Sequence, residues 1–106
     1  MEDGFTRLCR VDAVPENGVI QVSVRGMQDE LAVYNLGGEI CVTDDTCTHG
    51  MVSLAGGDIE DGQIYCPLHG GAFDIRTGEA SAAPCRIKLK TYEVAVVDGE
   101  VFARLA

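Results

Sequence analysis

The chain has 106 residues, a length that fits one domain, expected to span 1–106. Its 17 acidic and 8 basic residues give a formal net charge of −9, which argues against a nucleic-acid-binding protein, because such proteins carry a basic patch. The negative charge also disfavours docking on anionic membranes, and no apolar run approaches the roughly 18 residues of a spanning helix. Five cysteines are many for such a chain.

Alternating apolar and polar residues dominate the chain and predict an all-β fold. Gly37-Gly38 and Asp98-Gly99 each stand between two such segments and indicate two-residue hairpin turns, because glycine accepts positive φ. Several short strands at near-regular spacing are typical of an antiparallel β-sandwich or barrel. The predicted strands cover residues 5–11, 19–24, 31–36, 39–43, 92–97 and 100–105.

Residues 44–73 break this pattern. Two glycine-rich loops, Cys47-Thr48-His49-Gly50 and Cys66-Pro67-Leu68-His69-Gly70, flank a poor strand at 59–65. The spacing is C-x-H, sixteen residues, then C-x-x-H, and it contains both histidines of the chain. The acidic residues nearby, at 44–45, 58 and 60–61, are interpreted as a solvated surface, with partner recognition as the alternative.

Two thiolates and two imidazoles suit either Zn²⁺ or iron–sulfur iron. A structural zinc finger usually has two cysteines on one arm and two histidines on the other, whereas each loop here carries one of each. The C-x-H spacing is also tight for two bonds to one tetrahedral ion. A dinuclear cluster with both cysteines on one iron and both histidines on the other removes the difficulty, as in a Rieske [2Fe–2S] centre.

The two loops resemble the paired cluster-binding boxes of Rieske proteins, and the chain most resembles the ferredoxins of bacterial multicomponent aromatic-ring-hydroxylating dioxygenases. The resemblance implies a Rieske-type antiparallel β-sandwich or barrel with a small cluster-binding subdomain of two loops, at about 44–74. It implies one [2Fe–2S] cluster, with Cys47 and Cys66 on the inner iron and His49 and His69 on the outer one. The implied role is one-electron transfer, not catalysis, from a flavin-dependent NAD(P)H ferredoxin reductase to the terminal Rieske non-haem-iron oxygenase.

Departures from the respiratory and photosynthetic Rieske subunits sharpen this expectation. Val52 and Leu68 occupy the positions of their bridging cysteines, so that disulfide is absent. Gly71 and Phe73 stand where those subunits place hydroxyls beside the cluster sulfurs. Without such hydrogen bonds we expect a low potential, near the −150 mV end of the roughly −150 to +300 mV Rieske range.

The remaining three cysteines, Cys9, Cys41 and Cys85, are predicted to be small buried hydrophobic residues. Cys85 follows a segment that resembles the proline loop covering the cluster in this family, so it is expected near the cluster without binding it. The net charge predicts basic docking patches on both partners. The sequence opens with neither a basic nor an apolar signal segment, from which we expect a cytoplasmic protein that binds neither membrane nor nucleic acid.

Two alternatives stay open. The first is a Rieske-type small subunit of another oxidoreductase, such as a nitrite reductase. The second is a zinc-stabilised interaction module without a redox role.

Overall fold

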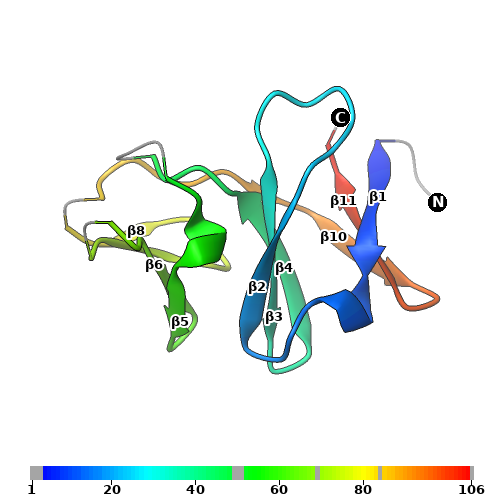
Figure 1. Cartoon of the computed structure of the whole chain (residues 1–106), viewed down its shortest axis with the longest axis horizontal. Helices are drawn as coiled ribbons and strands as arrows, with labels where there is room; N and C mark the ends of the chain where they lie inside the picture. Colours follow the sequence, from blue (N-terminus) through cyan, green and yellow to red (C-terminus); the bar gives the residue numbers. More distant parts are fainter. Residues whose placement is uncertain (1–3, 49–51, 69, 84, 106) are drawn as a thin grey trace.

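The structure is a computed structural model, and it describes residues 4–48, 52–68, 70–83 and 85–105. Within these residues the chain forms three antiparallel sheets and two short 3₁₀ helices, which confirms the predicted all-β fold (Figure 1). The 3₁₀ helices are η1 (Val11–Ala13) and η2 (Leu54–Gly56). Neither is long and apolar enough to cross a bilayer, and the described residues hold no other helix that could.

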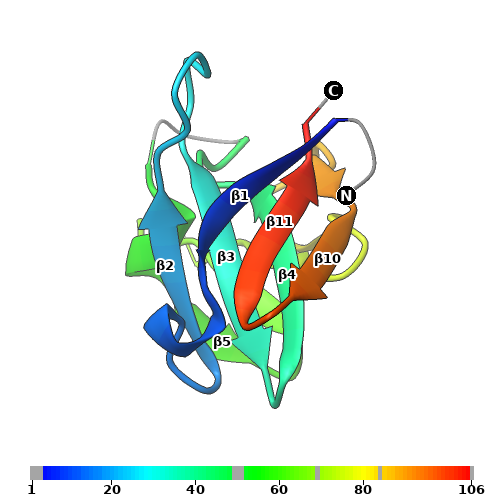
Figure 2. The same ribbon diagram turned by 90° about the vertical axis from the view of Figure 1, so that its right-hand side faces the viewer.

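The first sheet has the strand order β1-β11-β10 and the second the order β2-β3-β4-β9. Together we call these two sheets the body; Figure 2 shows the first lying across the second. The first sheet consists of β1 (Phe5–Arg10), β10 (Val94–Val97) and β11 (Glu100–Arg104). The second consists of β2 (Gly18–Val22), β3 (Leu31–Leu36), β4 (Glu39–Asp44) and β9 (Thr91–Tyr92).

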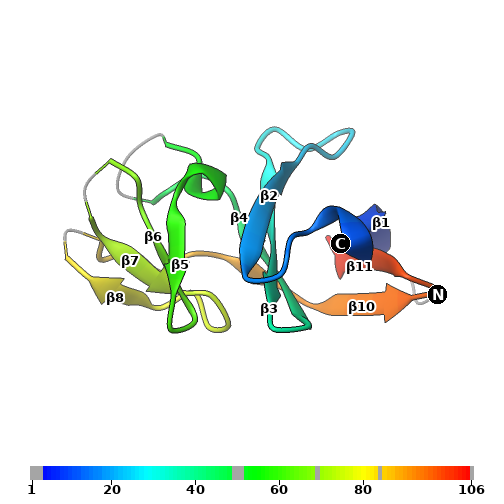
Figure 3. The ribbon, with the colours of Figure 1, turned by 60° about the horizontal axis from the view of Figure 1, so that its bottom comes forward.

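The third sheet, in the order β5-β6-β7-β8, lies on the other side of the second sheet (Figure 3). With the segments that connect it to the body we call it the loop region. Its strands have three residues each: β5 (Asp58–Glu60), β6 (Gln63–Tyr65), β7 (Ala72–Asp74) and β8 (Ala80–Ala82). Sequence reasoning did not predict β7 and β8 as strands.

Hairpin turns account for both the successes and the main error of the sequence prediction. The turns at Gly37-Gly38 and Asp98-Gly99 are confirmed, with positive φ at all four residues. The single strand expected over 59–65 is wrong, because Asp61-Gly62 forms a third turn of this kind, with φ of 52° and 75°. The segment is therefore the β5–β6 hairpin.

The buried side chains form two clusters, which lie on opposite faces of β3. Leu31 and Val33 pack into the body with residues of β4 and β11. Ala32 and Tyr34 point the other way and pack into the loop region. Because side chains of a strand alternate between faces, a strand covered on both sides needs an apolar residue at every position, and β3 begins with four buried residues in a row.

Asp45 joins the body to the loop region. Its side chain is buried, and its two carboxylate oxygens accept hydrogen bonds from Gln21 Nε2 (2.7 Å) and from the Ala55 backbone N–H (2.9 Å). Its own carbonyl accepts a bond from the Leu54 N–H (2.7 Å). A buried carboxylate is tolerated only when it is hydrogen-bonded. The interpretation of this residue as part of a solvated acidic surface is therefore wrong, and Asp45 instead fixes η2 against β2.

Candidate metal centre

Two loops of the loop region carry the predicted cysteines, and each is closed by the same kind of hydrogen bond. The Cys47 N–H donates to the Val52 carbonyl (2.9 Å), and the Cys66 N–H donates to the Gly71 carbonyl (2.7 Å). Each bond joins a cysteine to the residue five positions later. Two six-residue loops that begin on a cysteine are thus held in the same way, which gives the repeated Cys-and-His pattern of the sequence a structural counterpart.

The two cysteines are buried, and each residue is only 2% exposed. They pack in one apolar cluster with Leu54, Ile64 and Phe73, each of which is fully buried. This packing excludes water from the inner side of the two sulfur atoms. Buried sulfur donors from two loops suit a soft or borderline metal, as expected from the sequence.

His49 and His69 lie outside the described residues. In the sequence they fall between the two ends of the closed loops, His49 between Cys47 and Val52 and His69 between Cys66 and Gly71. Their predicted role as ligands is therefore taken up below as a proposal.

A third cysteine lies beside the first two. Cys85 belongs to the same buried cluster, at 5% exposure, and its N–H donates to the Ala82 carbonyl (3.2 Å). Burial, reinforced by the neighbouring thiols of Cys47 and Cys66, raises the pKa of the Cys85 thiol to about 11. The prediction that Cys85 is a buried residue close to the cysteine pair is confirmed.

Cys9 and Cys41 belong to the body and are only half-buried, which is less than the predicted burial. Cys9 packs against the apolar cluster of the body, and Cys41 packs against that of the loop region. Burial and the Glu39 carboxylate raise the pKa of the Cys41 thiol to about 11. Neither thiol joins the group formed by the other three cysteines.

Close backbone contacts set the positions of the loops, and sequence reasoning missed them. Thr48 Oγ1 donates to the Ile87 carbonyl (2.8 Å), which ties the first cysteine loop to the segment after Cys85. Gly57 lies so close to the chain before Cys66 that a Cβ there would stand 2.0 Å from the Tyr65 carbonyl oxygen. The glycine offered a signal in the sequence, whereas a threonine that bonds a carbonyl 39 residues away offers none.

Together the segments 46–48, 66–68 and 85–88 form one end of the molecule, which we call the loop end. It lies at the left of Figure 1, beyond the strands of the third sheet, and opposite the first sheet of the body. The buried Cys47 and Cys66 would hold a metal centre at this end.

A model of the Rieske [2Fe-2S] domain family matches residues 4–93. The chain therefore belongs to the Rieske [2Fe-2S] domain family and binds a Rieske-type [2Fe–2S] cluster, which the two buried cysteines fit. This family membership favours iron–sulfur over zinc, the alternative left open by the ligand types.

The relatives narrow the class to ferredoxins. The chain is 43% identical over 93 residues to the ferredoxin component of the naphthalene 1,2-dioxygenase system of Pseudomonas aeruginosa, covering 88% of each chain. It is 47% identical over 72 residues to ferredoxin CarAc of Metapseudomonas resinovorans, covering 68% of this chain and 67% of that one. These similarities confirm the resemblance to the ferredoxins of aromatic-ring dioxygenase systems.

Solved structures of ferredoxins agree with this similarity in sequence. A Sphingomonas yanoikuyae B1 ferredoxin superposes with a TM-score of 0.91 at 46% identity, covering 95% of this chain and 98% of that one. A complex of reduced oxygenase and oxidised ferredoxin from carbazole 1,9a-dioxygenase contains a chain with a TM-score of 0.89 at 36% identity, covering 97% and 94%. A protein assigned as the small subunit of a nitrite reductase shares the fold alone, at 22% identity and a TM-score of 0.75, covering 93% of this chain and 96% of that one.

Proposed function

We propose that this protein is the ferredoxin component of an aromatic-ring-hydroxylating dioxygenase system. It takes one electron from a flavin-dependent NAD(P)H reductase and passes it to the terminal Rieske non-haem-iron oxygenase. The observation that carries the proposal is the similarity, over about nine-tenths of both chains, to ferredoxin components of naphthalene dioxygenase systems. In each exchange the reductase loses one electron and the oxygenase gains one.

Four residues are proposed as the cluster ligands: Cys47, His49, Cys66 and His69. The support for the cysteines is their burial and their matching positions at the start of two closed loops. The support for the histidines is their place within the same loops in the sequence. When bound, the cluster supplies a centre that gains and loses one electron. Leu54, Ile64 and Phe73 pack in one buried cluster with the two cysteines and would keep water away from their sulfur atoms.

The remaining parts of the proposal concern the organisation and location of the protein. We propose that residues 1–106 form one domain whose cluster-binding part lies at about 44–74, and that the protein works in the cytoplasm. Strand β3 has buried side chains in both apolar clusters and so joins the body to the loop region, which supports one domain.

Electron transfer between purified proteins tests this function. The holoprotein, reduced in the absence of oxygen, is mixed with the oxidised terminal oxygenase of a naphthalene dioxygenase system, and the visible absorption of both clusters is followed. Rapid bleaching of the oxygenase cluster with matching reoxidation of this protein is the expected result. A reduced holoprotein that exchanges no electrons with any such oxygenase, and instead purifies in a stable complex with another reductase, would contradict the proposal.

A further inference from the structure

Two large apolar side chains are exposed at the loop end. Leu68 is 64% exposed and Ile87 is 66% exposed, the highest values among the large apolar residues that the structure describes. Leu68 lies two positions after Cys66, and Ile87 lies two positions after Cys85. The Ile87 carbonyl also accepts the Thr48 hydroxyl, so this segment lies against the first cysteine loop. Exposed apolar side chains that gather over a functional centre indicate a surface for another protein.

The charges of the loop end differ in sign from those of the whole chain. Three of the eight basic residues occur within the five positions 86–90. Arg86 and Lys88 are exposed on either side of Ile87. Lys90 is placed differently, with its ammonium 5.1 Å from the centre of the Tyr92 ring. Arg86 and Lys88 therefore place two exposed positive charges next to Ile87 in the chain.

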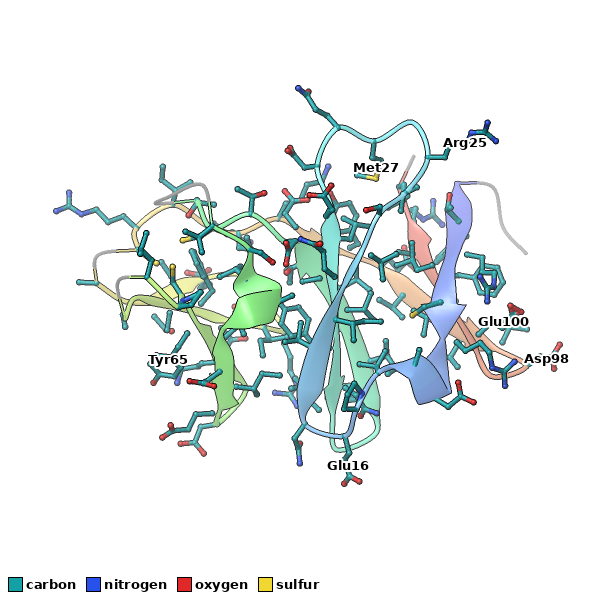
Figure 4. The ribbon with its side chains drawn as sticks, in the orientation of Figure 1. Glu16, Arg25, Met27, Tyr65, Asp98 and Glu100 are labelled. Carbon is teal, nitrogen blue, oxygen red and sulfur yellow. The ribbon has the colours of Figure 1, made fainter. Side chains whose placement is uncertain are left out.

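Most acidic side chains lie away from this end. The β5–β6 turn (60–63) and the β7–β8 turn (75–79) stand at the end of the third sheet opposite the segment 66–71, because β6 runs toward that segment and β7 runs back from it. Asp98 and Glu100 lie at the far side of the body, as labelled in Figure 4. Among the described residues, Asp58 and Asp44 lie nearer to it, since Asp58 is exposed and faces Tyr65 across the hairpin and the Asp44 N–H donates to the Lys90 carbonyl (3.0 Å).

From this distribution we infer that the surface of the terminal oxygenase that receives the loop end is apolar at its centre and acidic around it, with its carboxylates paired to Arg86 and Lys88. The inference rests on the proposed function. The oxygenase is chosen as the partner because a related ferredoxin has been solved in complex with an oxygenase. The inference differs from the expectation of basic docking patches, which follows from the net charge of −9 alone, because contact depends on the local charges of the face that docks.

Two matched charge reversals test the inference. Arg86→Glu and Arg25→Glu each change the net charge from −9 to −11, but Arg25 lies on the β2–β3 loop of the body, away from the loop end (Figure 4). Both side chains are exposed, so both variants are expected to fold. The visible spectrum and the reduction potential of each holoprotein show whether its cluster is unchanged.

The measured quantity is the second-order rate constant for electron transfer to the oxidised oxygenase of the naphthalene system at low salt. We expect Arg86→Glu to lower it by about tenfold and Lys88→Glu by a similar factor, while Arg25→Glu changes it less than about twofold. The difference between Arg86→Glu and the wild type is expected to shrink as salt screens the charges. Ile87→Ser is expected to lower the rate at every salt concentration, because it removes an apolar contact.

Three results would overturn the inference. Equal effects of Arg86→Glu and Arg25→Glu would show that only net charge matters, and a faster rate in Arg86→Glu would show that the docking surface of the oxygenase is basic. An unchanged rate in Arg86→Glu, with normal transfer by the wild type, would place the contact elsewhere. Absence of transfer by the wild type itself would overturn the proposed function, and the inference with it.

Discussion

The body and the loop region are built in different ways. Most strands of the body have four to six residues, whereas each strand of the loop region has three residues. The body is held by an apolar cluster of aliphatic residues. The cluster of the loop region contains three cysteines among its members, two of them proposed ligands. The comparison indicates that the body is stable through packing, while the loop region depends on its metal centre for part of its stability.

The largest effect is expected from removing a proposed ligand. Cys66→Ala should abolish cluster binding, and the purified protein should lack both iron and visible absorption. Amide exchange in the loop region should then speed up over 58–82, while 31–44 of the body stays protected. Cys41→Ala is the matched control, because it removes a half-buried thiol of the body and should leave the colour intact. A coloured Cys66→Ala protein would show that the ligand assignment is wrong.

Two truncations of buried side chains compare how far the stability of each region depends on the cluster. Leu31→Ala in the body and Ile64→Ala in the loop region each remove a fully buried aliphatic side chain, and each should cost about 2–5 kcal/mol in the holoprotein. In the cluster-free protein, Leu31→Ala should lower the free energy of unfolding by as much as in the holoprotein, whereas Ile64→Ala should lower it by much less. Denaturant unfolding of the wild type and of both variants, each with and without the cluster, measures this. Equal costs of Ile64→Ala with and without the cluster would show that the loop region is stable by itself.

A substitution at the junction between the body and the loop region should lower the free energy of unfolding by less than these core truncations. Asp45→Ala removes the acceptor of the Gln21 amide and of the Ala55 N–H, and an unsatisfied buried group costs about 1–3 kcal/mol. The free energy of unfolding should fall by that order. Asp58→Ala, at an exposed carboxylate of the same region, should change it by less than about 0.5 kcal/mol. If the two substitutions cost the same, Asp45 does not join the regions as described.

The smallest effect concerns the reduction potential. Phe73 packs in the same buried cluster as Cys47 and Cys66, so Phe73→Tyr can bring a hydroxyl toward a sulfur. A hydrogen bond worth about 0.5–1.4 kcal/mol would raise the one-electron potential by roughly 20–60 mV. Phe102→Tyr makes the same change in β11 of the body and should leave the potential unaltered. Protein-film voltammetry compares the two, and an unchanged potential in Phe73→Tyr with an intact cluster would contradict the expected placement.

The two regions also differ in how far the sequence predicted them. Long alternating segments and the turns at Gly37-Gly38 and Asp98-Gly99 made the hairpins of the body predictable. The turn at Asp61-Gly62 carries the same signal, but its flanking strands are too short for alternation to show. In the loop region the Cys-and-His spacing predicted the cluster, since ligand chemistry constrains local sequence. The roles of Asp45 and of the Thr48–Ile87 bond depend on partners distant in the sequence, so no local pattern could reveal them.

The central claim is that two cysteines and two histidines hold the cluster, and the nitrogen ligands can be detected directly. The chain contains only two histidines, so growth with ¹⁵N-labelled histidine marks both proposed nitrogen ligands and nothing else. Pulsed EPR of the reduced, labelled holoprotein should show hyperfine coupling to two histidine nitrogens. Coupling to no histidine nitrogen would show that the histidines do not bind the irons and would contradict the account.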